Sequence, residues 1–157
     1  GLAHEQAGEL ESAARWYRAA AEEGHAGAQC NLGLLYKEGR GVERSLDQAA
    51  HWTRLAAEQG FAPAQSNLGL LRLEGQGVPR DEELAAHWLR LAADQGLALA
   101  QHDLGLLYLK GRGVPRLPLE AARWLQLAAE QGLAAAQLEL AKLHEHGLGL
   151  VQDDVQD

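Results

Sequence analysis

The side chains that could carry catalytic chemistry are few and widely spaced. The 157-residue chain has seven histidines, three serines, one threonine and a single cysteine, Cys30. No serine is followed three residues later by a lysine, and the sequence G-x-S-x-G does not occur. Because covalent acyl transfer needs a nucleophile beside a base, these absences predict a protein that is not an enzyme.

The histidines also form a poor metal-binding pattern. His51 and His87 lie 36 residues apart, each before a tryptophan, while His144 and His146 are two residues apart. Residues two apart on a helix point in different directions, so this pair would not share one ion. A single cysteine excludes an internal disulfide and a thiolate zinc cage. We therefore expect solvated histidines, no metal and no cofactor.

Two glycine-rich turns share only their composition with phosphate-binding loops. Gly75-Gln76-Gly77 and Gly111-Arg112-Gly113 follow predicted helices, whereas a dinucleotide-binding loop follows a strand. The charge also argues against phosphate ligands, because 14 Lys and Arg stand against 22 Asp and Glu, a net charge of −8. We expect no nucleic-acid partner. No apolar run approaches the ~18 residues that span a bilayer, so we expect no membrane insertion.

A period of 36 residues organises the whole chain. Four tryptophans share it: Trp16, Trp52, Trp88 and Trp124. Rows of glycine, alanine, glutamine and leucine keep the same register, and one glycine row falls inside predicted helices, at Gly33, Gly69 and Gly105. A fixed period of this length indicates a solenoid, in which no unit buries its apolar face alone. We expect the tryptophans to be core wedges and these glycines to permit close helix packing.

Each unit is predicted to contain two helices. Leu68 and Leu71 continue a helical spacing that ends at the glycine turn, and Asp81 is then a good N-cap for a second helix. In the preceding unit Ser45 begins a capping box with Gln48. Sustained β alternation is absent from the sequence. The predicted fold class is therefore all-α.

The unit A-Q-x-x-L-G-L-L-Y-x-x-G-x-G-V, followed by A-A-x-W-x-x-x-A-A-E-x-G, closely resembles the SEL-like repeat, a relative of the tetratricopeptide repeats. The resemblance implies a right-handed α/α superhelical solenoid of antiparallel helix pairs, whose first helices line a concave face. It predicts a single repeat domain over residues 1–157. Its full repeats are 25–60, 61–96 and 97–132, and its partial repeats are 1–24 and 133–157, the last with an acidic tail.

Some positions depart from the repeat. Arg72 and His144 replace an expected tyrosine. Residues 2–7 are predicted to be the tail of a first helix, joined to the next helix by a short turn at Ala7-Gly8-Glu9. The chain has no methionine, and we expect it to be a processed piece of a longer protein. After Gly149 the chain is either a cut array or a natural acidic end.

The resemblance also implies a ligand-binding face on the first helices, where Asn31 and Asn67 match an asparagine that relatives use to hold a peptide backbone. Leucines would form an apolar strip along this face, although the same leucines could instead be core residues. The predicted ligand-binding residues are Asn31, Leu34, Lys37, Ser66, Asn67, Leu70, Leu73, His102, Asp103, Leu106, Leu109 and Lys110.

From these patterns we predict a non-enzymatic scaffold or adaptor, bacterial in composition, that binds a protein or peptide segment in the concave groove. The alternative is an immunity protein or inhibitor that neutralises a cognate secreted toxin or enzyme. A monomer is the default expectation. No targeting segment is evident, so the sequence leaves both a cytoplasmic and a periplasmic location open.

Overall fold

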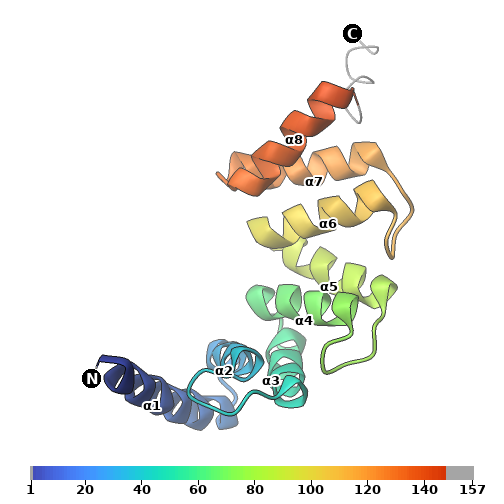
Figure 1. The fold of residues 1–157 in the computed structure, drawn as a ribbon. Helices are drawn as coiled ribbons and strands as arrows, with labels where there is room; N and C mark the ends of the chain where they lie inside the picture. The colour runs from blue at the N-terminus through green and yellow to red at the C-terminus, as the bar shows by residue number, and fades with distance from the viewer. Residues whose placement is uncertain (1, 148–157) are drawn as a thin grey trace. The chain divides into compact units, whose positions relative to one another are not determined.

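The computed structural model describes residues 2–147, and within this range all regular structure is helical (Figure 1). Within residues 2–80 and within residues 81–147, consecutive helices pack against each other, confirming the all-α prediction and the 36-residue repeat. The helices are α1 Leu2–Glu22, α2 Ala26–Glu38, α3 Leu46–Glu58, α4 Ala62–Glu74, α5 Glu82–Asp94, α6 Ala98–Lys110, α7 Pro118–Glu130 and α8 Ala134–His146. None of them is long and apolar enough to cross a membrane.

The helix ends follow from capping chemistry that the sequence predicted. The Ser45 hydroxyl accepts a hydrogen bond from the Gln48 backbone N–H at 3.2 Å, and a carboxylate oxygen of Asp81 accepts one from the Leu84 N–H at 3.0 Å. Each satisfies a donor that the first helical turn would otherwise leave open. The first helices α2, α4 and α6 end at glycines in the left-handed region, such as Gly75 with φ 70°.

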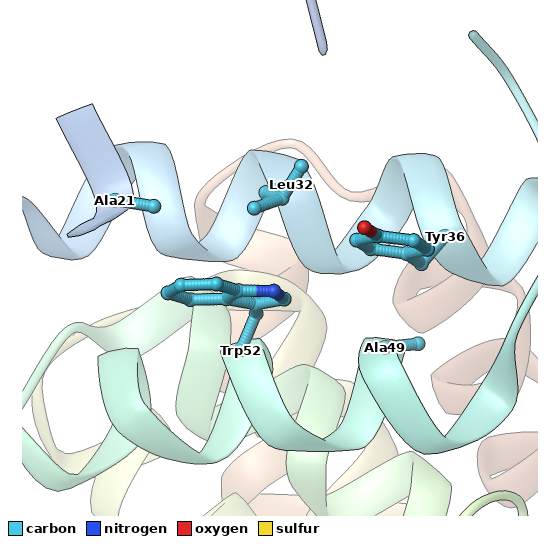
Figure 2. Close-up of a cluster of buried hydrophobic side chains, with 5 residues drawn as sticks. All are labelled: Ala21, Leu32, Tyr36, Ala49 and Trp52. Carbon is cyan, nitrogen blue, oxygen red and sulfur yellow. The ribbon is translucent and has the colours of Figure 1, made fainter. Parts of the chain in front are cut away.

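The chain forms two compact units, Gly1–Arg80 with α1–α4 and Asp81–Asp157 with α5–α8. In the first unit, Trp52 extends from α3 toward α2, where it packs against Leu32 and Tyr36 (Figure 2). Ala21 and Ala49 complete this cluster. Trp52 is therefore the core wedge that the repeat predicts.

In the second unit a buried cluster lies between α7 and α8, a second helix and the first helix that follows it. Leu125 and Leu143 are buried there, together with the small residues Ala122, Ala128 and Ala136. Small residues let the helix axes approach closely, which leaves the leucines to fill the remaining space.

Glycines inside the first helices have the steric role that the sequence predicted. A Cβ at Gly33 would lie 2.6 Å from the Thr53 hydroxyl oxygen, and a Cβ at Gly105 would lie 2.8 Å from the Leu125 Cγ. Both distances are far below van der Waals contact. The second helix of each pair can pack this closely only because no side chain intervenes.

The glycine turns are also structural. Gly113 has φ 72°, and a Cβ there would collide with the backbone carbonyl of Glu82 at the start of α5. The space beside the turn is thus filled by α5, the second helix of the preceding repeat. This packing supports the structural interpretation of the turns over the phosphate-binding one.

Two predictions about the N-terminal region are wrong. Helix α1 runs without interruption through Ala7-Gly8-Glu9, where a turn was expected, and Trp16 is 77% exposed. A single glycine among good helix formers does not break the helix, and a Cβ placed at Gly8 would meet no other part of the protein within 4 Å. Residues 2–7 therefore continue the helical axis and do not fold back over Trp16. Helix α2 covers Trp52, and within the described residues no equivalent helix covers Trp16.

Glutamines tie neighbouring repeats together, a role that the sequence did not reveal. The Gln59 amide donates to the Gly24 carbonyl at 3.0 Å and to the Gln29 side-chain oxygen at 2.8 Å. The second unit repeats this glutamine clasp, because Gln131 donates to the Gly96 carbonyl at 2.8 Å and to Gln101 at 2.9 Å. In each clasp the bond to the glycine carbonyl links a repeat to the one before it, and the second bond satisfies the side-chain oxygen of a buried glutamine, Gln29 or Gln101.

Candidate protein-interaction site

The candidate site is the surface of the first helices that carries the predicted residues, called here the first-helix face; α2 and α4 carry it in the first unit, and α6 carries it in the second. It is exposed at Asn31 and Lys110 and half-buried at most other positions. Half-burial suits a recognition surface, since such side chains are held in place yet still offer atoms to a partner.

In the first unit, Asn67 is already engaged with the protein itself. Its side-chain N–H donates to the Cys30 Sγ at 3.6 Å, joining α4 to α2. Within residues 2–147 its side-chain oxygen makes no hydrogen bond, and the amide nitrogen has a second N–H besides the one that reaches Cys30. The predicted use of Asn67 as both donor and acceptor is therefore compatible with the Cys30 bond.

Cys30 itself is enclosed by the fold. The residue is buried, and burial raises the pKa of its thiol, while the hydrogen bond from Asn67 opposes part of the rise. A thiol with a raised pKa is a poor nucleophile at neutral pH. Cys30 therefore acts as a small packing residue with a weak acceptor.

Ser66 does not belong to the accessible face, which corrects its prediction as a ligand-binding residue. It occupies the same repeat position as Cys30, and both are buried, with Ser66 only 5% exposed. The helical pattern placed it one step too far toward solvent. A hydroxyl so enclosed has almost no surface to offer a partner.

In the second unit the equivalent positions carry ionisable side chains. His102 Nδ1 lies 3.3 Å from a carboxylate oxygen of Asp103, and the two side chains are only 15% and 24% exposed. Burial raises the pKa of the Asp103 carboxyl above its ordinary value, and the adjacent His102 opposes part of that rise.

The predicted leucine strip is divided between core and surface. Leu109 packs against the core cluster of the second unit, so the core alternative holds for this residue. Leu34, Leu70, Leu73 and Leu106 are half-buried. Lys37 is half-buried as well.

Two exposed leucines extend the apolar surface of the second unit beyond the predicted residues. Leu99 on α6 and Leu138 on α8 are each 57% exposed. A signal was present in the sequence, because leucine at 99 stands where the earlier repeats carry Gly27 and Pro63. An exposed leucine at a position without a packing role marks a surface available to a partner.

Within residues 2–147 no cluster of three or more His, Cys, Asp or Glu side chains could hold a metal ion. His51 and His87 are exposed on the second helices, as predicted. The site therefore offers amide, carboxylate, imidazole and apolar groups, which is the chemistry of peptide and protein recognition.

The comparison with known proteins agrees with the repeat. The Sel1 repeat profile matches residues 8–25, 26–61, 62–97, 98–133 and 134–156. No curated protein matches the chain.

Two solved structures are similar in sequence and in fold. One is c5321, a protective antigen present in uropathogenic Escherichia coli strains displaying an SLR fold (40% identity, TM-score 0.82), with 87% of this chain aligned. The other is a Sel1 repeat protein from Oxalobacter formigenes (42% identity, TM-score 0.81), with 89% aligned. The chain spans only 29% and 40% of the lengths of these two proteins. With repeats matched along nearly its whole length, the chain belongs to the Sel1 repeat family, whose members generally act as protein–protein interaction scaffolds.

Proposed function

We propose that this protein is a non-enzymatic interaction module that binds a peptide or protein segment along the first-helix face. The observation that supports this best is a contrast between positions within one repeat. Several rows that pack the core or form the glutamine clasp keep one residue type, as Gln29, Gln65 and Gln101 do. Positions on the first-helix face change from repeat to repeat, and structural demands alone do not require such variety.

One varying row shows this clearly. Gly27, Pro63 and Leu99 occupy a single repeat position on the first helices, and none of them is buried. The row of Asn31, Asn67 and Asp103 changes likewise, from neutral amides to a carboxylate. A rigid helical surface whose side chains differ from repeat to repeat is suited to recognising the particular side chains of a bound segment.

The geometry in the first unit supports an extended or helical segment with mixed polarity. The open side-chain oxygen of Asn67 is an acceptor for a backbone N–H, and the half-buried Leu70 lies three residues along the same helix face. A bound segment would satisfy the amide and cover the leucine together. Burying the amide and the leucine together stabilises the complex more than burying either one alone, because the apolar contact excludes water from the hydrogen bond.

The test is a titration of peptides selected from a random peptide library on the immobilised protein. Leu70→Asp is expected to weaken binding at least about a hundredfold by burying a charge, and Asn67→Ala about tenfold by leaving a backbone group unpaired. Arg54→Ala is the matched control, because Arg54 is an exposed second-helix residue that pairs only with Glu58 across one turn. Loss of binding in Arg54→Ala, with Asn67→Ala unaffected, would show that the second helices bind instead.

The inhibitor role would use the same face, and it stays a prediction. A single abundant partner of secreted type in a pull-down from the native organism would favour it over a scaffold with several partners.

A further inference from the structure

Helix α6 carries other residue types than α2 and α4 at two first-helix positions where packing does not require one particular residue. Asp103 stands where the earlier repeats have Asn31 and Asn67. Seven residues later, Lys110 stands where they have Glu38 and Glu74. The side chains have nearly the same size in the first case, so the change is one of charge and not of shape.

The Asp103 carboxylate is costly to the fold and unnecessary for it. Its side chain is 24% exposed, and its hydrogen-bond partner in the described structure is His102, at 3.3 Å through one oxygen. Burial raises the pKa of this carboxyl. Neutral asparagines at the same position in two other repeats show that the helix pair forms without the charge. A partly buried charge without a structural role points to a ligand.

Apolar groups flank this carboxylate along the helix. Leu99 lies four residues before Asp103 and is 57% exposed, and Leu106 lies three residues after it and is half-buried. Residues at these spacings share one face of a helix. The face thus presents a single acceptor between two apolar side chains, where a covering partner would exclude water and strengthen a charged contact.

Resting on the proposed function, we propose that the α6 face recognises a lysine or arginine side chain of the partner, with Asp103 as the acceptor of its cationic group and Leu99 and Leu106 as contacts for flanking apolar residues. The second carboxylate oxygen of Asp103 makes no hydrogen bond within residues 2–147, and it is available to a guanidinium or ammonium donor.

Lys110 adds a direction to this recognition. It lies seven residues beyond Asp103 on the same helix, about 10 Å away at 1.5 Å per residue. About three residues of an extended segment cover that distance. A partner with an acidic residue roughly three positions from the base would therefore meet both charges.

The experiment is a selection from a random peptide library on the wild-type protein, followed by titration of the selected peptides against variants. Binders whose capture is lost in Leu99→Asp or Leu106→Asp define the α6 face, and Leu99→Asp is the safer variant because Leu99 is exposed. These binders are expected to be enriched in lysine or arginine. Asp103→Asn is expected to weaken them about tenfold, as is replacing the peptide's base with glutamine, and the two changes together should cost no more than either alone.

Asp94→Asn is the matched control, because it removes one carboxylate from an exposed position on α5 in the same unit. It should leave the selected peptides bound as before. If Asp103→Asn binds them as tightly as wild type while Leu99→Asp does not bind, the cation recognition is wrong and the proposed function stands. If no selected peptide depends on Leu70, Leu99 or Leu106, the proposed function is itself wrong.

Discussion

The first-helix faces of the two units share two neighbouring repeat positions but use them in opposite ways. In the first unit Asn67 donates to the Cys30 sulfur, a neutral contact that joins two helices. In the second unit the same two positions carry Asp103 and His102, a half-buried carboxyl and imidazole that face each other on one helix. Packing below these positions is equivalent, since Gly33 and Gly105 both admit a close second helix. The difference shows that the repeat fixes the scaffold while leaving the chemistry of this face to each unit.

The first prediction concerns whether a shared repeat position means a shared environment, and it has the largest expected effect. Trp52→Ala should lower the free energy of unfolding by about 3–5 kcal/mol, because it removes a large buried side chain. Trp16→Ala should change it by less than about 1 kcal/mol, because Trp16 is exposed. Urea denaturation followed by circular dichroism measures both. Equal losses would mean that Trp16 is covered in solution.

The second prediction tests the claim that packing is equivalent in the two units. Gly33→Ala and Gly105→Ala should each destabilise the protein by about 1–3 kcal/mol, since the added Cβ meets Thr53 or Leu125 inside van der Waals distance. The higher helix propensity of alanine, ~1 kcal/mol, would offset part of this cost. Thermal melts of both variants provide the measurement. A stabilised Gly105→Ala beside a destabilised Gly33→Ala would contradict the equivalence.

The third prediction moves the charge of the second unit into the first. Asn67→Asp should destabilise the protein by about 1 kcal/mol at neutral pH, because the new carboxylate is half-buried and loses the donor that reaches Cys30. The neighbouring position holds Ser66 and not a histidine, so no cation compensates. Asn31→Asp is the control, since Asn31 is exposed and its variant should unfold within ~0.5 kcal/mol of wild type.

The fourth prediction is the reverse exchange and has the smallest effect. Asp103→Asn should raise the free energy of unfolding by up to about 1 kcal/mol at neutral pH. Because burial raises the pKa of the folded-state carboxyl, the native protein retains this proton where the unfolded chain has lost it. The Asp103 contribution to stability is thus fullest in acid and is lost as the pH rises through the raised pKa.

The difference in free energy of unfolding between Asp103→Asn and wild type should accordingly grow as the pH rises from about 4 and then level off. Urea denaturation of wild type and Asp103→Asn across this range gives the difference. An advantage that shrinks as the pH rises would mean that His102 outweighs burial and that the pKa is lowered.

The regular part of the fold was predictable because it repeats. The period of Trp52, the N-caps Ser45 and Asp81 and the glycine turns all indicated helix pairs, and the structure has them. Local capping and spacing are properties of neighbouring residues, so the sequence contains them directly.

The irregular part depended on contacts that a pattern does not report. Ser66 and Leu109 lie on the expected helix but are enclosed by neighbours. Trp16 keeps the repeat position of Trp52 and yet has no covering helix. Burial depends on what packs against a residue, and a one-dimensional period gives only where that residue points. The Asn67–Cys30 contact joins residues 37 apart and was equally invisible.

The glutamine clasp has a consequence for how such a chain changes length in evolution. Gln59 carries the donor and Gln29 the acceptor of a hydrogen bond between residues 30 apart in the chain, and Gln131 and Gln101 carry the same two parts. A duplication or deletion of 36 residues would therefore place a donor opposite an acceptor at the new junction, wherever the break occurred. The gene can gain or lose a repeat in one step without leaving a buried amide unpaired, and a new copy of the first-helix face comes with each gain.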